Sequence, residues 1–312
     1  MDFRELSYVL AIAKYQNITK AAESLYIGQP TLSKFLMSLE SDLGLKLFRR
    51  LGNKYILTYA GERYVGRANQ ILGVKSDLDA EMADIIKRDI GVLNVAFANM
   101  RCSYMLPDTL PTFQKHHPNV KINIYEGNSS QNDRLILSGD IDVAFSSKPS
   151  ELNPLIEYQS LGKEELVICT CENHALGRFA HPNPASKYPK LDVSLLKNEK
   201  VLMMQPDQRT RQIVDKFLKD REICFENVLY TSNLQAIMEL VAIGYGVSFI
   251  FESHLRHRAD TKPIECYSFG EPKVVNDFVA AYRKGSYLSA YAHEYVEVVR
   301  QSFLKGETRQ LT

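Results

Sequence analysis

Two short polar segments near the N-terminus carry residue types suited to contacting nucleic acid. The first, QPTLSK at residues 29–34, places Gln29 and Ser33 one turn apart on the same side of a predicted helix. Glutamine can form paired hydrogen bonds to adenine, and serine can donate or accept a hydrogen bond at a base edge. Lys34 is expected to contact a phosphate, which adds affinity without sequence information. This face therefore has the chemistry needed to enter a major groove.

The second segment is a basic turn. Two predicted strands, 46–48 and 55–57, are joined by a turn that carries Arg49, Arg50 and Lys54. Three cations on a hairpin are typical of a wing that lies on phosphates or in a minor groove. Seen alone, a polar helix face followed by a basic turn is more often a solvated surface. The ordered combination is more specific, and it favours a winged helix-turn-helix.

Three helices must position these two segments. Apolar residues at helical spacing predict an amphipathic helix over 3–15, and Thr19 is expected to cap a short second helix over 20–25. Pro30 suits the first turn of the third helix, which Gly44 ends. The expected buried stripe of that helix consists of Leu32, Leu36, Leu39 and Leu43.

Composition limits how such a surface can work. The 312 residues are 45% hydrophobic and 24% charged with a formal net charge of +1, so any nucleic-acid surface must be a local patch. Residues 1–60 hold eight Lys or Arg against five Asp or Glu. No apolar run approaches the ~20 residues that a membrane span needs, and the N-terminus lacks the pattern of a secretion signal. A cytoplasmic location is expected.

The same segments resemble a known family. The N-terminal signature of LysR-type regulators is matched by AAESL at 21–25, QPTLS at 29–33, LFRR at 47–50 and LTYAG at 57–61. The resemblance implies sequence-specific, double-stranded DNA binding that controls transcription. DNA contacts are then expected at Gln29, Pro30, Thr31, Ser33, Lys34, Arg49, Arg50 and Lys54.

One position departs from the family pattern. Gly28 stands where the family commonly has a serine that caps the recognition helix. Glycine is a usable cap, but it lacks the side-chain acceptor and loses a candidate phosphate contact.

A long helix is predicted next, from a cap at Thr58 to about Arg88. Its apolar residues alternate steps of four and three with one polar interruption, which is heptad spacing. That seam consists of Tyr64, Ala68, Ile71, Lys75, Leu78, Met82 and Ile85. A helix folded onto its own domain is the simpler interpretation. The resemblance implies instead a linker helix that pairs two chains antiparallel, within a homodimer and most commonly a homotetramer that bends its operator.

The rest of the chain alternates strands with helices. Strands predicted over 92–97, 120–125 and 141–145 imply right-handed crossovers and a mostly parallel sheet. This part of the chain resembles the LysR effector domain in four segments: MLP at 105–107, HPNV at 117–120, GDIDVA at 139–144 and LVAIGYGV at 240–247. The predicted fold class is α/β with an N-terminal all-α winged helix-turn-helix, a long linker helix and a periplasmic-binding-protein-like effector domain of two α/β subdomains. The expected boundaries are 1–58, 59–89 and 90–312, with subdomain one at 91–161 and 269–312 and subdomain two at 162–268.

Ligands of open α/β sheets bind beyond the carboxyl ends of the strands, often at helix N-termini. A small polar or anionic metabolite is the expected effector, and no cofactor or metal is expected. For any single loop residue, an ordinary turn-forming role is about as good an interpretation. The candidate effector contacts are Ala98, Asn99, Met100, Arg101, Cys102, Asn128, Ser129, Ser130, Ser146, Gln205, Ser232, Gly246 and Val247.

Five cysteines at irregular spacing do not suggest a disulfide framework. In Cys169-Thr170-Cys171, strand alternation would direct both sulfurs to one face, and packing is the favoured interpretation. Oxidation of Cys102 is an alternative input, although Cys224 has no close sequence partner.

Two other function classes compete with regulation. An enzyme is disfavoured because the sequence has no Gly-rich phosphate loop, metal-ligand cluster or Gly-x-Ser-x-Gly turn. A solute-binding protein would explain residues 91–312 but leaves the first 90 unexplained. The partners expected of a regulator are DNA, a small effector and a second copy of the chain, with RNA polymerase as a further candidate.

Overall fold

Periodic apolar residues organise the chain into two compact units, made mainly of residues 1–87 and 88–312. The structure is a computed structural model, and it describes residues 2–85, 90–256 and 262–308. Within these residues, no helix combines the length and the apolar character that crossing a membrane requires.

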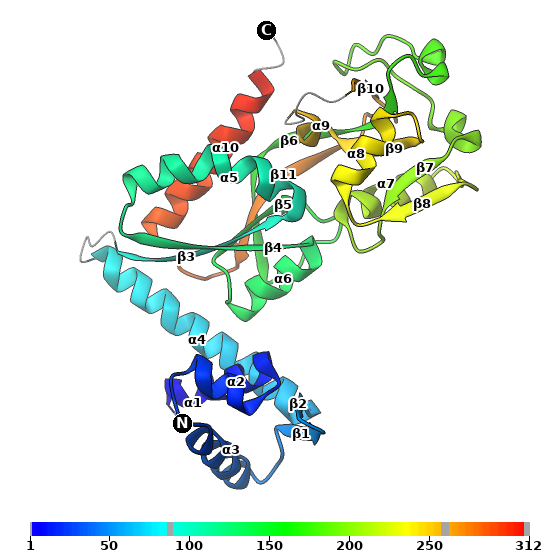
Figure 1. The fold of residues 1–312 in the computed structure, drawn as a ribbon. Coiled ribbons are helices and arrows are strands. Elements are labelled where there is room, and N and C mark those ends of the chain that lie inside the picture. The colour runs from blue at the N-terminus through cyan, green and yellow to red at the C-terminus, as the bar shows by residue number, and fades with distance from the viewer. Residues whose placement is uncertain (1, 86–89, 257–261, 309–312) are drawn as a thin grey trace. The chain divides into compact units, whose positions relative to one another are not determined.

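The first unit is a helical domain with a two-stranded hairpin, followed by one long helix (Figure 1). Val9, Ile12, Leu32, Leu36 and Leu47 are fully or almost fully buried and form the centre of its core. Its elements are α1 (Phe3–Tyr15), α2 (Ile18–Ser24), α3 (Gln29–Leu43), β1 (Phe48–Leu51), β2 (Lys54–Leu57) and α4 (Tyr59–Ile85).

Three sequence predictions for this unit were wrong in detail. Asn17, not Thr19, caps α2: its side chain accepts hydrogen bonds from the backbone N–H groups of Thr19 and Lys20. Leu43 was predicted to be buried but is 42% exposed; the buried residue near the end of α3 is Glu40.

The third error concerns the hairpin. Arg49 and Arg50 lie within β1, and only two residues separate Leu51 from its partner Lys54. Gly52 has φ of 59°, a conformation open to glycine that lets the chain reverse so tightly.

The long helix begins where the sequence predicts. The Thr58 hydroxyl accepts a hydrogen bond from the N–H of Gly61, and α4 runs to Ile85. The predicted end near Arg88 lies outside the described residues. Several apolar side chains in the described part of α4 are 39–63% exposed, namely those of Ile71, Val74, Leu78 and Met82.

The second unit is built around one continuous nine-stranded sheet. Its strands are β3 (Gly91–Ala98), β4 (Val120–Gly127), β5 (Val143–Ser147), β6 (Ile156–Cys171), β7 (Val201–Met204), β8 (Val228–Thr231), β9 (Val247–Phe251), β10 (Ile264–Tyr267) and β11 (Val275–Arg283). Its helices are α5 (Asn99–His116), α6 (Ser129–Ser138), α7 (Arg209–Lys219), α8 (Leu234–Ala242), α9 (Glu252–Leu255) and α10 (Ala290–Thr308), with 3-10 turns at Ala175–Phe179 and Val193–Asn198.

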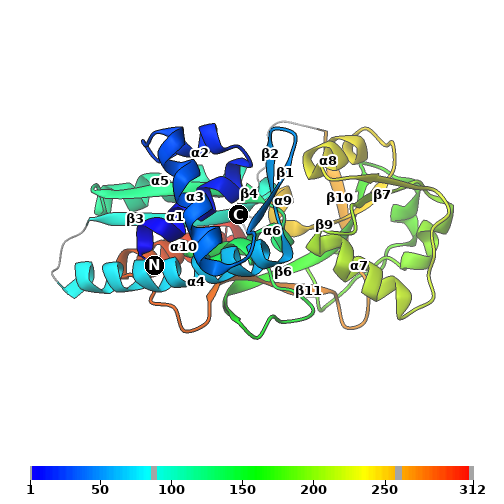
Figure 2. The same cartoon turned by 90° about the horizontal axis from the view of Figure 1, so that it is seen from below.

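Strand direction divides this sheet into two halves. The strand order is β4-β3-β5-β11-β6-β9-β7-β8, with β10 paired to β6. β3, β4 and β5 are mutually parallel in one half, and β7, β8 and β9 are mutually parallel in the other. β6 and β11 are antiparallel to each other and run between the halves (Figures 1 and 2). In the first half, α5 and α10 cover one face of the sheet and α6 the other (Figure 1).

Each half has its own apolar core, and the strands cross from one core to the other. Leu161 of β6 belongs to the first core and Leu166 to the second. On the return, Phe269 packs in the second core and Phe278 in the first. The chain thus returns from the second core to the first along β11. At the crossing the register shifts: Phe278 pairs with Gly162 and Val279 with Ser160, a β-bulge that leaves one β6 residue extra.

Candidate functional site

The start of α3 presents a polar face to solvent. Gln29, Pro30, Thr31 and Lys34 are exposed and Ser33 is half-buried, while Leu32 is fully buried. Gln29 and Pro30 form the first turn, and Gly28 contributes no side-chain hydrogen bond as the cap. Pro30 has no N–H, and the N–H of Thr31 donates to the Gly28 carbonyl (3.0 Å), so the polar side chains and not the backbone give this turn its affinity for base edges and phosphates.

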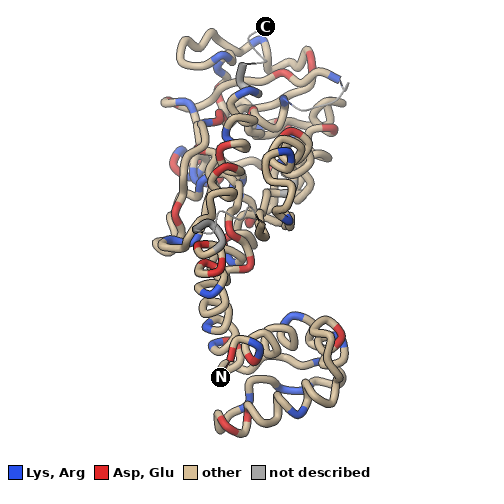
Figure 3. The backbone as a smooth tube through the Cα atoms, turned by 90° about the vertical axis from the view of Figure 1, so that its left-hand side faces the viewer, with Lys and Arg blue, Asp and Glu red and all other residues tan. Residues whose placement is uncertain are grey.

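The hairpin carries the basic side chains. Arg49, Arg50 and Lys54 are exposed, and the Arg50 Nε atom donates a 3.0 Å hydrogen bond to the Gly52 carbonyl. Basic and acidic residues are interspersed along the whole chain (Figure 3). Because the whole chain has a formal net charge of only +1, the positive charge available to DNA comes from local groups such as the three cations of this hairpin.

Glu40 fixes the hairpin to the end of α3, a contact that the sequence analysis missed. Its side chain is only 6% exposed. One carboxylate oxygen accepts from the N–H groups of Leu47 (2.9 Å) and Phe48 (3.1 Å), and the other accepts from Lys46 Nζ (2.7 Å). The buried carboxylate thus satisfies two backbone donors where β1 begins.

A cavity of about 420 Å³ lies at the carboxyl ends of the parallel strands in the second unit. The first half of the sheet contributes Ala98, Met100, Arg101, Ser103, Ser129 and Ser147 to its wall. The second half contributes Met204, Gln208, Arg209, Thr210, Ser232, Asn233, Leu234, Gln235 and His254. Its volume is that of a small-metabolite site.

Five of the predicted effector residues line this cavity: Ala98, Met100, Arg101, Ser129 and Ser232. Asn99 begins α5. Asn128 caps α6, where its side chain accepts from the N–H of Gln131, and its amide also donates to Asp207 (2.7 Å).

The other predicted effector residues are not in the cavity wall. Cys102 belongs to the apolar core of the first half, and Ser146 is buried within β5. Ser130 is exposed on α6, and Gln205 precedes the lining residues that begin α7. Gly246 and Val247 stand where β9 begins, whereas the cavity lies at the end where β9 stops.

Most of the lining residues that were not predicted follow strand ends in the second half, while Ser103 and Ser147 belong to the first. Gln208, Arg209 and Thr210 form the start of α7 after β7, and His254 lies in α9 after β9. The ends of β7 and β9 could have predicted these residues from the sequence. The Gly-Tyr-Gly turn led instead to a prediction at Gly246 and Val247, where β9 begins.

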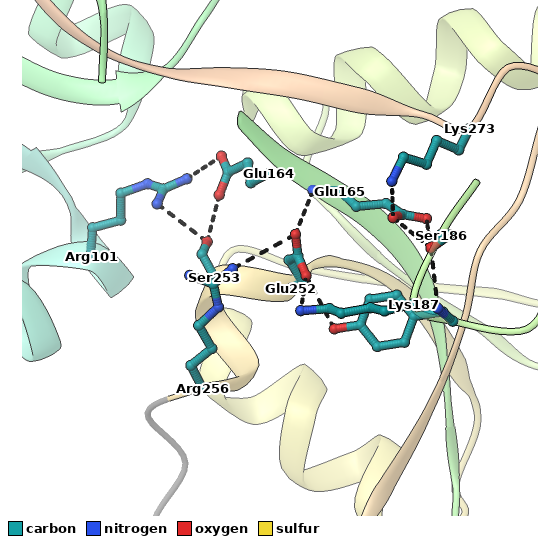
Figure 4. Close-up of polar contacts among 10 residues, drawn as sticks. Arg101, Glu164, Glu165, Ser186, Lys187, Glu252, Ser253, Arg256 and Lys273 are labelled. Carbon is teal, nitrogen blue, oxygen red and sulfur yellow. Dashed lines mark hydrogen bonds and ion pairs between the residues drawn. The ribbon is translucent and has the colours of Figure 1, made fainter. Parts of the chain in front are cut away.

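Arg101 lines the cavity and is already paired with Glu164 (Figure 4). Its guanidinium is 1% exposed, lies 2.5 Å from Glu164 and is 4.4 Å above the Phe278 ring. Ser147 and Ser253 complete the network, since each accepts from Arg101 and donates to Glu164. Arg101 thus joins the two halves of the sheet, and its charge is neutralised before any ligand enters.

A second ionic network lies on the other side of the same segments (Figure 4). Glu165 accepts from Ser186 and Lys273, and its backbone N–H donates to Glu252. Burial raises the pKa of the Glu252 carboxyl, but hydrogen bonds from Lys187 and the Glu165 N–H outweigh it and hold that pKa below its usual value. Every carboxylate here has cationic partners, which indicates a structural role.

Helix N-termini give the cavity a positive potential. α5 and α7 both start at its wall, and neither has a side-chain cap on its N-terminal N–H groups. Arg209 bonds to Asp133 through Nη2 (2.7 Å), while its buried Nε has no hydrogen-bond partner among the described residues. The uncapped first turns of α5 and α7 lie at one cavity wall, where they would stabilise a bound anion.

Cys102 is poorly placed for redox chemistry. Its thiol is buried, and burial, together with the nearby Glu126 carboxylate, raises its pKa to about 12. Because the thiolate is the reactive form, this environment disfavours oxidation.

Comparisons with known proteins agree with both units. Residues 3–62 match the model of the bacterial regulatory helix-turn-helix proteins of the lysR family, and residues 87–304 match the LysR substrate binding domain. Curated relatives include a probable RuBisCO transcriptional regulator of Trieres chinensis, 26% identical over 87% of both chains. Another is the transcriptional regulator CysB of Haemophilus influenzae, 25% identical over 95% of this chain and 89% of that protein.

Solved structures share the fold along the whole chain. Full-length OxyR from Pseudomonas aeruginosa superposes with a TM-score of 0.74 at 24% identity, covering 97% of this chain and 94% of that one. CbnR, solved in complex with its target DNA, has a TM-score of 0.62 at 22% identity, covering 97% and 100%.

Proposed function

This chain belongs to the LysR family of bacterial transcription regulators, and we propose that α3 and the β1–β2 hairpin bind operator DNA under the control of a small anion in the cavity. The observation that carries the DNA-binding assignment is the exposed polar start of α3 beside an exposed basic hairpin. The observation that carries the effector class is the convergence of uncapped helix N-termini and Arg209 on one cavity.

In the proposed complex the two segments have different tasks. Gln29 and Ser33 read base edges, with Pro30 and Thr31 in van der Waals contact and Lys34 on a phosphate. Arg49, Arg50 and Lys54 bind the sugar-phosphate backbone. Specificity then resides mainly in α3, and salt-dependent affinity resides in the hairpin.

A salt-titrated binding assay on genomic fragments tests the DNA-binding proposal, starting with DNA upstream of the protein's own gene. Tight binding to a few fragments is expected, with affinity falling steeply as salt rises. An absence of binding to every fragment at low salt would contradict the proposal.

Substitutions at Gln29 and Arg50 should separate the two tasks. Gln29→Ala is expected to lower the ratio of operator to random-sequence affinity about tenfold to a hundredfold, since one paired base contact supplies roughly 1–3 kcal/mol of discrimination. Arg50→Ala should weaken both kinds of binding and reduce the salt slope by about 0.9. Lys219→Ala, at an exposed position of α7 in the other unit, is the control for loss of a charge. Equal effects of the Gln29 and Arg50 variants would refute the division of roles.

A homodimer through α4 is the proposed assembly. Ile71, Val74, Leu78 and Met82 form an exposed apolar surface on this helix, and pairing with a second α4 would cover it. A dimer also presents two copies of α3 to two half-sites. We extend this to a homotetramer, in which the effector changes the spacing of the DNA-binding units through linkage. The same proposal implies that the protein contacts RNA polymerase at the promoter and that it is located in the cytoplasm.

The proposed effector is a small carboxylate or comparable anion. It would accept hydrogen bonds from the first turns of α5 and α7 and from the partly exposed guanidinium of Arg209. Ser129, Ser232 and Gln235 would bind its remaining polar groups. Arg101 is fully buried against Glu164, whereas the ion pair between Arg209 and Asp133 is partly exposed, so Arg209 is the cation expected to set the preference for negative charge.

Arg209 therefore gives a test of the effector class. A panel of mono- and dicarboxylates should contain compounds that raise the thermal melting temperature of the second unit, because a ligand that binds only the folded state stabilises it. Arg209→Gln should lower the affinity for these compounds about tenfold or more, given that charge-assisted hydrogen bonds contribute roughly 1.5–3 kcal/mol. Lys219→Gln, with the same charge change on the same helix, should leave the affinity unaltered. An Arg209→Gln protein that binds the anions as well as the parent would contradict this assignment.

A further inference from the structure

Two cysteines lie directly opposite each other on neighbouring strands of the second unit. β10 pairs antiparallel with β6, and the register places Cys266 against Cys169. Opposite residues in such a pair have Cα atoms about 4.5–5.5 Å apart. Disulfides join Cα atoms about 4.4–6.8 Å apart, so the backbone already has the required spacing.

Both thiols face the same side of the sheet. Ile168 and Tyr267, the neighbouring pair in the register, pack into one apolar core. Cys169 and Cys266 pack into a different cluster with Tyr188 and α8 residues such as Met238. Since side chains alternate between the faces of a strand, the two sulfurs share one face.

The two sulfurs differ in exposure. Cys169 is fully buried, whereas Cys266 is only partly buried. Each Sγ atom lies 4.0 Å from a carbonyl in its own strand, that of Val167 and that of Ile264. Because the strands already have the required spacing, bringing the two sulfurs together calls for rotation of their side chains.

We propose that Cys169 and Cys266 are a redox modification site that closes to a cross-strand disulfide on exposure to a hydroperoxide. The thiolate of Cys266 attacks the terminal peroxide oxygen, which breaks the O–O bond, releases water or an alcohol and leaves a sulfenic acid. The Cys169 sulfur then attacks the Cys266 sulfur and displaces hydroxide, which leaves as water after taking up the Cys169 proton. Two thiols are oxidised by two electrons, and one hydroperoxide is reduced.

The other cysteines do not offer this geometry. Cys102 is in the core of the other half of the sheet, and Cys224 is exposed outside the paired strands. Cys171 pairs with Ile264, so it is diagonal to Cys266, at a spacing of roughly 7–8 Å that is long for a disulfide. The site is independent of the DNA and effector assignments made above.

The experiment is peptide mapping of the full-length protein after oxidation. The reduced chain is treated with hydrogen peroxide, denatured, blocked with N-ethylmaleimide and digested with trypsin without reductant. A linked pair of peptides is expected, 164–178 joined to 259–273, at the expense of two of the five alkylated thiols. Denaturing, non-reducing electrophoresis should show the oxidised protein at monomer mass, because the bond is within one chain.

Substitutions identify the bonded sulfurs. Cys266→Ser and Cys169→Ala should each abolish the linked peptides, whereas Cys171→Ser and Cys224→Ser should retain them. Because Cys266 is partly exposed, its serine variant tests the site even where the variant at the buried Cys169 folds poorly. Full alkylation of all five cysteines after peroxide treatment would overturn the proposal. Linked peptides that persist in Cys169→Ala would overturn it too, by assigning the bond to Cys171.

Discussion

Arg101→Met is expected to destabilise the second unit by about 3–5 kcal/mol, the usual cost of removing one partner of a buried ion pair. The reason is that the Glu164 carboxylate, 1% exposed, would lose its countercharge and keep only hydrogen bonds from Ser147 and Ser253. Urea denaturation followed by tyrosine fluorescence measures the effect, since the chain has 17 tyrosines and no tryptophan. A change of this size would remove much of the stability of an ordinary domain.

A double variant separates the pair from its surroundings. Arg101→Met combined with Glu164→Leu removes both charges and should regain most of the lost stability, because an apolar replacement of a buried pair is often neutral or better. An Arg101→Met protein as stable as the parent would contradict this account of the buried pair. The same double variant should still bind the carboxylates that depend on Arg209, which tests whether Arg101 is part of the fold and not of ligand recognition.

Glu40→Ala should destabilise the first unit by about 2–4 kcal/mol and weaken DNA binding with it. The substitution leaves the buried N–H groups of Leu47 and Phe48 without an acceptor, and each unsatisfied group costs roughly 1–3 kcal/mol. The hairpin would also lose its attachment to the end of α3. Thermal melting and operator affinity, measured on the same preparation, check the two parts of this expectation.

The ion pair of Glu40 provides the matched control. Lys46 bonds to the same carboxylate, but its side chain is 71% exposed. Lys46→Ala should therefore cost less than about 1 kcal/mol, as exposed salt bridges generally do. Similar losses in the Glu40 and Lys46 variants would show that charge, and not the satisfaction of the backbone, fixes the hairpin.

Periodicity predicted the helices of the first unit well because a single apolar stripe defines each of them. α1 has the predicted bounds, and the cap at Thr58 is confirmed. The errors arose where one polar side chain has several available tasks. Asn17 and Thr19 are both residue types that commonly cap helices. The spacing that predicted a buried Leu43 does not show that the Glu40 carboxylate accepts hydrogen bonds from the backbone at the start of β1.

Topology was easier to predict than the cavity wall. Alternating strands and helices predicted the parallel strands of the first half, and the rule that ligands lie beyond carboxyl ends led to Ala98, Ser129 and Ser232. The direction of a side chain within a loop depends on contacts far away in sequence. Arg101 turns toward Glu164, which is 63 residues later, and no local pattern contains that information.

The two halves of the second unit are connected by a pair of hydrogen-bonded strands and not by flexible loops. β6 and β11 are hydrogen-bonded side by side through the crossing, so the halves cannot rotate freely about a few loop torsions. Any change of angle must be taken up as twist along this ribbon, and the bulge beside Gly162 is where the ladder resists twisting least. We therefore expect any rotation between the halves to be small and to be opposed by the hydrogen bonds of this ribbon.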